Sequence, residues 1–480
     1  MNSSSQAITA LQKAFPDNQT FLRGSPEFDE LNGSYLSAIE GDIIPAAIFR
    51  PKDKHEVSKF LHITQPYTSN GDVKFAVRGG GQQPTHACAN IQDGITLDLG
   101  MLTGIEIRDS SVSIAAGERW GAVYERLLPL GLATSGSRSG KGGIGGLSLA
   151  GGLSFFSTRE GFIADNVINY EIVLASGDIV NANKHENTDL LIALRGGGNN
   201  FGVVTRYDVR TFKQGPLWGG SVYYFTPSFP SQLEALVTEL KKPNATAETH
   251  LMLSIGYAAQ FGQTMCQNQL YYTQETETNP PVLEPFTNIQ PQIDALYSMR
   301  KLNVVDAATE QTGDAMERQR TSYMNTVIRA DVDALQAAAD IYTAALEPIK
   351  TVEGLVCSLT LQPYPVSLLK KTAEAGGNSL GLDPANGPLV SILLLTYWKN
   401  RSDDEQVFQV MNSTLQKIKN DSRVRNQTVK YEFMSYAASF QDPIDSYGAE
   451  NKIKLQDVSK KYDPKGLFQK AVRGGFKLFT

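Results

Sequence analysis

Hydrophobic and polar positions follow different patterns in the first and second halves of the chain. Up to about residue 213, short apolar runs such as residues 73–78 alternate with helical patterns such as residues 120–131, which end at a glycine. Asp53 can cap a helix that extends to about residue 63. Two apolar runs around a Ser-Gly-Asp turn predict a hairpin over residues 170–182. This half predicts a first domain over residues 1–213.

Beyond residue 214 the pattern changes to long amphipathic helices and separated strands. Helical periodicity predicts helices over residues 230–242, 332–347 and 402–419. The longest apolar run, residues 389–398, is far too short to span a bilayer and predicts a buried strand. An antiparallel sheet backed by helices is therefore expected over residues 214–430, which gives the whole chain an α+β fold.

Composition and charge exclude several classes of protein. The chain has 480 residues, 41% hydrophobic and 20% charged, which is typical of a globular protein with more than one core. Its net charge of -6 gives no general attraction to nucleic acid or to anionic membranes. The three cysteines and five histidines show no metal-ligand spacing, so we expect neither a metal site nor a disulfide framework.

Localisation signals point in two directions. The start of the chain has no long apolar stretch, so we expect no signal peptide and no membrane anchor, and a cytoplasmic protein. Eight N-x-[ST] sequons favour secretion instead. They lie at Asn2, Asn18, Asn32, Asn244, Asn400, Asn412, Asn420 and Asn426.

A glycine triplet directly follows the predicted strand at residues 73–78. In the run VRGGGQQP, residues 77–84, successive glycines can turn with positive φ and expose several N–H groups together. Such a nest binds an anion, typically a phosphate, and Arg78 can add charge. The alternative is a plain tight turn.

A second glycine cluster covers residues 136–157. Its eight glycines are incompatible with a stable helix and suit a backbone packed against a flat ligand. Phe155 and Phe156 are expected to follow as a strand-like anchor. A flexible loop is the alternative, but apolar residues alternate with the glycines and indicate burial.

A third cluster, within residues 193–209, follows a predicted helix and precedes a predicted strand. That order is the reverse of the dinucleotide-binding strand–GxGxxG–helix fingerprint. The pattern therefore gives little support to NAD binding.

Six motifs occur in a fixed order along the chain and carry a resemblance to a known family. They are R-G-G-G-Q-Q, S-R-x-x-x-G-G-I-G-G, G-G-L-S-F-F-S, G-F-I-A-D-N-V, D-L-L-I-A-L-R-G-G-G-N-N-F-G-V-V-T and the tail Q-D-P-I-x-S-Y-G…Y-D-P-K-G-L-F-Q. Together they resemble the berberine-bridge-enzyme-like FAD-linked oxidases of the vanillyl-alcohol-oxidase superfamily, which carry a PCMH-type FAD-binding domain. The resemblance is strong over residues 44–212 and moderate over residues 431–469.

The resemblance implies a two-domain fold and a set of cofactor-binding residues. A PCMH-type core over residues 44–213 would bind FAD together with the tail, residues 431–480, while residues 214–430 form an inserted substrate domain over the isoalloxazine ring. The implied FAD contacts are Arg78, Gly79, Gly80, Gly81, Gln82 and Gln83 at the pyrophosphate; Ser137, Arg138, Ser139, Gly142, Gly143 and Gly146 along the flavin; Val203 at the adenine or ribose; and Ser435 and Tyr436 from the tail.

The chain departs from the family at both positions of covalent flavin attachment. Gln82 stands where the linked relatives have histidine, and Ser139 stands where bicovalent members have cysteine. We therefore expect FAD to bind non-covalently and to be a weaker oxidant than in linked relatives. Attachment relocated to His86 or Cys88 is the disfavoured alternative. Gly142, at the family's oxygen-gating position, leaves access for O₂ open.

Candidate catalytic residues come from the substrate domain and the tail. Tyr397 and Tyr436 can act as acid or base or orient a substrate, and Gln362 and Tyr364 are candidates for the substrate pocket. Ordinary strand packing is the alternative for each. The favoured function is oxidation of a small organic molecule, such as a secondary metabolite, by hydride transfer to flavin with O₂ as acceptor. A flavin-dependent isomerase or cyclase without net redox change is the second hypothesis, and a non-catalytic flavin-binding protein is the third.

Overall fold

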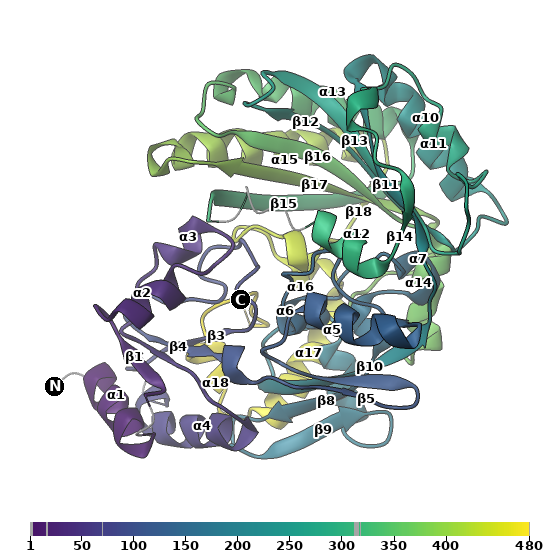
Figure 1. Ribbon diagram of the computed structural model, residues 1–480. Coiled ribbons are helices and arrows are strands. Elements are labelled where there is room, and N and C mark those ends of the chain that lie inside the picture. Colours follow the sequence, from purple (N-terminus) through teal and green to yellow (C-terminus); the bar gives the residue numbers. More distant parts are fainter. Residues whose placement is uncertain (1–2, 16–17, 70, 312–315, 317, 480) are drawn as a thin grey trace.

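The computed structural model describes residues 3–15, 18–69, 71–311, 316 and 318–479. Across these residues the strands form three sheets: one of four strands in the order β1-β2-β4-β3, one of six with β5-β6-β10-β8-β9 and β7 beside β10, and one of eight in the order β14-β11-β13-β12-β16-β17-β15-β18. In Figure 1 the eight-stranded sheet lies above the two smaller sheets. The strands of the smaller sheets all precede residue 214, and those of the large sheet follow it.

The four-stranded sheet explains the first short apolar runs. It consists of β1 Thr20–Leu22, β2 Ala47–Phe49, β3 Phe75–Arg78 and β4 Ile95–Asp98. β2 and β3 each pair with β4 in parallel, and such strands are continuous apolar runs because both of their faces are covered. The predicted helix after Asp53 is confirmed as α4, Lys54–Thr68, with the Asp53 carboxylate accepting from the N–H groups of His55 and Glu56. It is longer than expected and continues beyond residue 63 to Thr68.

The six-stranded sheet is built around one long strand, β10 Val203–Lys213. β10 pairs antiparallel with β6, β7 and β8, and the predicted hairpin is confirmed as β8 and β9. The other strands are β5 Ile105–Ile107, β6 Ser111–Ala115, β7 Leu132–Thr134, β8 Val167–Val173 and β9 Ile179–Asn183.

The eight-stranded sheet is antiparallel throughout, as the second half of the sequence predicts. Three long helices, α10, α13 and α15, cover its upper face in Figure 1 and share one hydrophobic core with it. Its strands are β11 Leu217–Phe225, β12 Thr249–Ala258, β13 Gln263–Tyr272, β14 Arg300–Leu302, β15 Arg320–Arg329, β16 Val356–Tyr364, β17 Leu389–Trp398 and β18 Thr428–Val429.

The helices complete these layers. The α-helices not yet given are α1 Ser3–Ala14, α2 Pro26–Asn32, α3 Ala38–Gly41, α5 Trp120–Leu127, α6 Ile144–Leu149, α7 Ser157–Glu160, α8 Ile163–Asn166, α9 Thr188–Leu194, α10 Phe229–Lys241, α11 Glu284–Thr287, α12 Val304–Glu310, α13 Val332–Ala345, α14 Val366–Glu374, α15 Asp404–Val424, α16 Pro443–Ser446, α17 Ala449–Tyr462 and α18 Leu467–Lys470. Among those of the described residues, none combines the length and apolar character that crossing a bilayer requires.

Two expectations for the second glycine cluster are wrong. Residues 144–149 form the short helix α6 in spite of Gly145 and Gly146, because Ile144 and Leu149 are buried and tertiary packing outweighs the low helix propensity of glycine. Phe155 and Phe156 are not in a strand; they are buried in the turn before α7.

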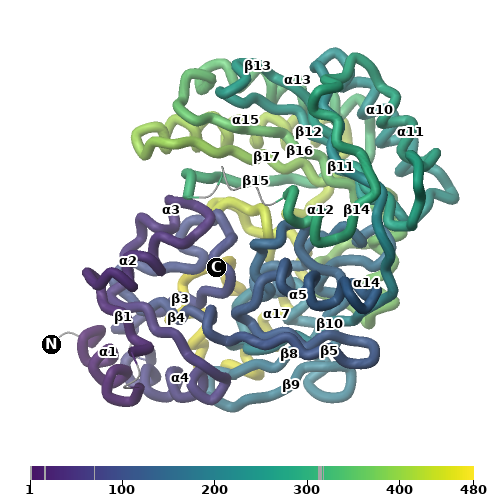
Figure 2. Tube along the Cα trace, viewed as in Figure 1, coloured from purple at the N-terminus to yellow at the C-terminus, as the bar shows by residue number. Residues whose placement is uncertain are grey.

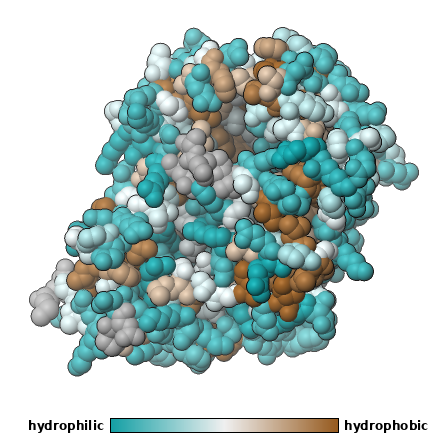
Figure 3. Space-filling view, in the orientation of Figure 1, coloured by the Kyte–Doolittle hydropathy of each residue, from teal (hydrophilic) through white to brown (hydrophobic). Residues whose placement is uncertain are grey.

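The first part of the chain, which contains β1 to β10, and the inserted part, which contains β11 to β18, also share hydrophobic contacts. Val304, Ala307 and Ala308 of α12 belong to the same buried cluster as Trp120 and Val123 of α5. Figure 3 shows apolar side chains gathering on this face of the molecule over α5 and α12. The inserted part is therefore packed on the first part through apolar surface as well as through the chain connections.

The C-terminal tail returns to the first part of the chain, as Figure 2 shows by the yellow trace among the darker elements. The Phe75 N–H donates to the Ala471 carbonyl over 3.1 Å, and Asn200 Nδ2 donates to the Phe476 carbonyl over 2.8 Å. Val472 and Leu478 are fully buried in the core that contains Phe75. The smaller sheets thus depend on residues from both ends of the chain.

The sequon positions are not equivalent in the fold. Asn2 lies outside the described residues. Asn32 is buried, and its amide donates to the carbonyls of Gly41 and Ile43, so it offers no acceptor site for a glycan in the folded chain. The cytoplasmic location stays a prediction.

Candidate functional site

A cavity of about 790 Å³ lies between the glycine-rich loops of the first part and the inner face of the eight-stranded sheet. That volume is at the upper end of the range for ligand pockets, roughly 300–1,000 Å³. The loops contribute residues 79–84, 137–139, 141–143, 198–199 and 202–204, and the tail contributes residues 434–436 and 475–476. Segments far apart in the sequence therefore form one site.

The inner face of the sheet follows from the alternation of side chains along its strands. On β12, Leu251, Leu253 and Ile255 pack into the core under the helices, while Met252 and Ser254 line the cavity. Neighbouring strands repeat this arrangement. Their cavity-facing residues include Gln267 on β13, Tyr323 on β15, Thr360 and Gln362 on β16, and Leu393, Leu395 and Tyr397 on β17.

The first two glycine clusters contact each other directly at the floor of the cavity. A Cβ atom added to Gly80 would lie 2.5 Å from the Gly143 Cα atom, and one added to Gly143 would lie 2.5 Å from the Gly80 Cα atom. Arg119 Nη1 donates to the carbonyls of Gly80, over 2.5 Å, and Lys141, over 2.9 Å. Gly81 has a φ of 63°, which suits a turn that exposes backbone N–H groups.

Two further glycines face open cavity, where a ligand can lie, and not another protein segment. Gly79 and Gly146 line the cavity, and a Cβ atom added to either would meet no protein atom within 4 Å. Close loop packing at Gly80 and Gly143, with open backbone beside it, fits the cradle that a flat dinucleotide such as FAD requires.

Most predicted site residues line this one cavity. They are Gly79, Gly80, Gly81, Gln82, Gln83, Ser137, Arg138, Ser139, Gly142, Gly143, Gly146, Val203, Ser435, Tyr436, Gln362 and Tyr397. Their location together does not test their individual roles, which stay predictions.

Arg78 is not part of the cavity lining, contrary to the expectation that it adds charge to a phosphate site. Its guanidinium is buried and donates to the Leu31 carbonyl over 2.7 Å and to Ser34 Oγ over 2.7 Å. It also lies 3.5 Å from the Asp98 carboxylate and over the Tyr35 ring. These partners satisfy the Arg78 guanidinium within the loops of the four-stranded sheet. Arg78 therefore stabilises the glycine turn from the side away from the cavity.

Tyr364 also lies outside the cavity, contrary to its predicted place in the substrate pocket. It is fully buried among Phe162, Tyr431 and Phe433, with ring centroids 5.7 to 6.4 Å apart. Gln362, two residues earlier on β16, does line the cavity. Sequence patterns put both residues on the same face, but β16 ends at Tyr364 against the aromatic cluster.

A polar chain crosses from the second glycine cluster to the sheet. Arg138 Nη2 donates to the Tyr436 hydroxyl over 2.6 Å, and that hydroxyl donates to Gln362 Oε1 over 3.1 Å. Arg138 Nη1 lies 3.2 Å from the Met252 sulfur on β12. A cation, a phenol and an amide are thus aligned along one wall of the cavity.

A pair of tyrosines occupies the same side of the cavity. The hydroxyls of Tyr323 and Tyr397 are 2.7 Å apart, and the Tyr323 ring also makes an edge contact with Tyr436. Burial raises the pKa of Tyr397 and raises that of Tyr323 well above its ordinary value. Both phenols therefore keep their protons at neutral pH, and because one hydroxyl donates to the other, the pair has one proton left to donate to a ligand.

The candidate attachment positions differ in their surroundings. Gln82, Ser139 and Cys88 line the cavity, whereas His86 is exposed and outside it. Burial raises the pKa of the Cys88 thiol to about 12, which disfavours the thiolate that covalent chemistry requires.

No group of three or more His, Cys, Asp or Glu side chains in the described residues is arranged to hold a metal ion.

Several cavity residues were missed by sequence reasoning. Tyr323 and Met252 sit in ordinary strands and carry no motif. Asn199 and Phe476 lie beside glycines, in the third cluster and in the pair Gly474-Gly475, which was an available signal. Next to them, Lys477 Nζ donates to Asn199 Oδ1 over 3.1 Å, and burial lowers its pKa to about 7.

Comparison with known proteins agrees with this geometry. Residues 45–183 match the family described as FAD binding domain. The chain is 32% identical over 504 residues to the FAD-dependent monooxygenase tpcD of Cochliobolus heterostrophus, covering 99% of this chain and 96% of that protein. It is 34% identical over 461 residues to the FAD-dependent monooxygenase FUP4 of Fusarium proliferatum, covering 94% and 88%. Physcomitrella patens BBE-like 1 has a similar fold, with a TM-score of 0.81, 17% identity and 99% coverage of both chains. This likeness confirms the predicted fold class.

Proposed function

Because the chain belongs to the family of FAD-dependent monooxygenases that includes these fungal relatives, we propose that it is a FAD-dependent oxidoreductase acting on a small organic molecule in secondary metabolism. The observation that supports this most is the single cavity in which a cradle of open glycine backbone faces the polar chain from Arg138 to Gln362. The cofactor would lie along residues 79–83 and 137–146, and the substrate between it and the sheet.

When bound, FAD supplies the acceptor for a hydride from the substrate and the route by which O₂ takes up the electrons. The protein supplies position and proton transfer. We assign proton transfer to Tyr436 Oη, because that hydroxyl lines the cavity and is held in place by the Arg138 guanidinium, which donates to it, and by Gln362, which accepts from it. The hydroxyl pair of Tyr397 and Tyr323 orients the substrate through the one proton that their mutual hydrogen bond does not use.

We further propose that FAD is held without a covalent bond. The motif resemblance supports this, because it aligns Gln82 and Ser139 with the two positions at which linked relatives are attached, and neither side chain can form the usual link. Acid precipitation of the yellow protein tests this directly. All of the flavin is expected in the supernatant, and flavin in the washed pellet contradicts the proposal.

The redox reaction is tested with the flavin spectrum. The protein reconstituted with FAD is mixed anaerobically with candidate substrates and then with O₂. Bleaching near 450 nm, followed by recovery on aeration, is the expected result. Turnover without bleaching and without O₂ uptake contradicts net oxidation and indicates an isomerase or cyclase. A preparation that stays colourless with FAD contradicts the function as a whole.

A further inference from the structure

Charged residues are few in the cavity, and their balance is positive. Within the described residues its charged lining consists of Arg138, Lys141 and Glu310. Glu310 already forms an ion pair with Arg300. The rest of the lining on the sheet side is apolar or neutral, with Met252, Leu393 and the tyrosine pair among its members.

Arg138 differs from the other arginines that are largely buried in this fold. Arg78, Arg159 and Arg320 each lie within ion-pair distance of at least one carboxylate. Arg195 donates to three backbone carbonyls. The side-chain partners of Arg138 are instead the Met252 thioether and the Tyr436 phenol, and no carboxylate of the described residues pairs with it. A guanidinium has five N–H donors, so most of its capacity remains for a ligand.

The direction of the Arg138 side chain separates it from the phosphate end of the cradle. Its terminal nitrogens reach Met252 on β12 and Tyr436, which bonds to Gln362 on β16. The guanidinium therefore lies against the sheet, on the side of the cavity assigned to the substrate. The glycine triplet of residues 79–81 is on a separate loop.

We propose that Arg138 binds an oxyanion of the substrate, and that the substrate class is an apolar ring compound carrying a carboxylate or an ionised enol. This inference rests on the proposed function, because it concerns the substrate half of the same cavity. A planar guanidinium binds such an oxygen with charge-assisted hydrogen bonds, and the apolar lining accepts the ring. The same contact places the anion next to Tyr436, where proton transfer is assigned.

The test uses ligands that perturb the spectrum of the bound flavin, applied to the full chain reconstituted with FAD. One pair of probes is 2-naphthoate and 2-naphthamide, and the other is 4-hydroxycoumarin and 4-methoxycoumarin. We expect the anionic member of a pair to bind at least about tenfold more tightly than the neutral member. The pair that shows the preference distinguishes a carboxylate from an enolate.

Arg138→Gln should abolish that preference while the FAD dissociation constant changes less than about twofold. Arg138→Lys should keep part of it. Arg126→Gln, the same charge change at an exposed arginine of α5 outside the cavity lining, should retain it. A preference lost equally in R126Q, no preference in the wild-type holoprotein, or an R138Q effect confined to FAD affinity overturns the inference. Failure to bind FAD overturns the proposed function instead, so the two are distinguishable.

Discussion

Tyr436 stands at the meeting point of three parts of the chain. Its hydroxyl comes from the tail, accepts from Arg138 in the second glycine cluster and donates to Gln362 in the large sheet. Tyr397 is instead bonded to Tyr323 within the sheet. The two predicted catalytic tyrosines therefore have different partners and different expected roles.

Replacing Tyr436 by phenylalanine removes the oxygen to which we assign proton transfer and leaves the ring. We expect Tyr436→Phe to slow anaerobic flavin reduction by substrate by about 100-fold or more, because general acid–base groups contribute on that scale. Tyr397→Phe should slow it by at most about tenfold, as expected for one orienting hydrogen bond. Stopped-flow absorbance measures both rates, with the FAD dissociation constant of each variant as the control. Equal effects of the two substitutions contradict the assignment.

We expect the stability of the protein to depend on pH through Glu40. It is buried, it accepts from the N–H groups of Ala87 and Ala89, and burial raises its pKa from 4.5 to about 7. The folded chain thus keeps a proton that the unfolded chain loses between pH 4.5 and 7. Stability therefore falls as the pH rises through this window.

Glu40→Gln should flatten this dependence, by up to roughly 3 kcal/mol between pH 4.5 and 7. Urea denaturation at several pH values in the window measures it. The exposed Glu234 provides the control, since Glu234→Gln should leave the slope of the wild-type protein unchanged. A slope in E40Q equal to that of the wild type would show that the Glu40 carboxylate is not its cause.

At the scale of elements, the glycine loops combine contact with each other and contact with a ligand. Gly80 and Gly143 face backbone atoms of one another, whereas Gly146 in α6 faces open cavity. The same substitution, glycine to alanine, therefore has opposite consequences for the apoprotein at the two kinds of position.

Gly146→Ala should leave the apoprotein as stable as the wild type or more stable by up to about 1 kcal/mol, since alanine favours a helix. It should weaken FAD binding by about tenfold, because the methyl group enters the space of the cofactor. Thermal unfolding of the apoprotein and a fluorescence titration with FAD separate the two effects. Unchanged FAD affinity would place the cofactor away from α6.

Gly80→Ala is the matched substitution at a position where the backbone of another loop leaves no space for a Cβ atom. Its Cβ would lie 2.5 Å from Gly143 Cα and 2.8 Å from Gly143 N, which are backbone atoms of another loop. We expect the apoprotein to lose about 1–3 kcal/mol, as for overpacking in general, and FAD affinity to fall as well. An apoprotein melting temperature equal to that of the wild type would contradict the loop contact.

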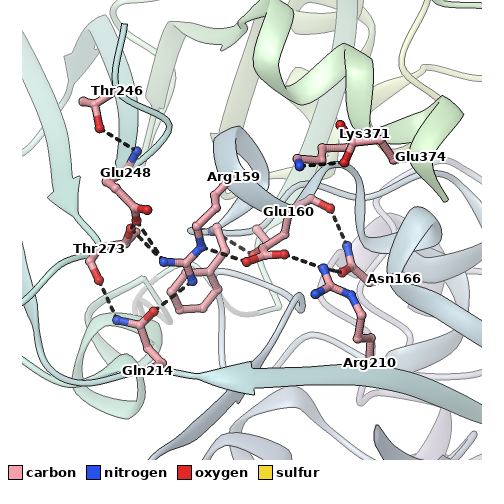
Figure 4. A network of polar contacts seen from close by, with 12 residues as sticks. Arg159, Glu160, Asn166, Arg210, Gln214, Thr246, Glu248, Thr273, Lys371 and Glu374 are labelled. Carbon is pink, nitrogen blue, oxygen red and sulfur yellow. Dashed lines mark hydrogen bonds and ion pairs between the residues drawn. The ribbon is translucent and has the colours of Figure 1, made fainter. Parts of the chain in front are cut away.

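For the whole molecule, polar contacts around Arg159 join the first part to the inserted part (Figure 4). Arg159, at α7, donates to Glu160 over 2.7 Å, to Glu248 beside β12 over 2.8 Å and to Gln214 between β10 and β11 over 3.0 Å. Its guanidinium also lies 5.0 Å from the centre of the Phe212 ring. The network therefore links α7 of the first part to the chain at the start of β11 and β12.

Arg159→Ala should lower the free energy of unfolding by about 2 kcal/mol, because several charge-assisted hydrogen bonds are lost at a half-buried site. Guanidinium denaturation measures the loss. Lys454→Ala removes a well-exposed ion pair with Glu450 and should leave the midpoint unchanged. A loss in R159A no larger than in K454A contradicts a joining role for the network.

The sequence by itself determined what depends on local pattern. Apolar runs predicted strands of the large sheet, periodicity predicted its helices, and ordered motifs predicted an FAD-binding fold and a set of site residues, most of which line the cavity. The domain boundaries at residues 213 and 430 stay a prediction, although the change of sheet falls between β10 and β11.

Only the tertiary structure decided which polar side chains meet. Arg78 was predicted as a phosphate ligand, but its guanidinium is paired with Leu31, Ser34 and Asp98. Arg138 donates instead to Tyr436, which lies 298 residues further along the chain. The propensity of glycine against helix was likewise overruled in α6 by packing. Local pattern fixes which face a residue occupies, whereas the partner across a cavity is set by the packing of distant segments, which no single window of sequence contains.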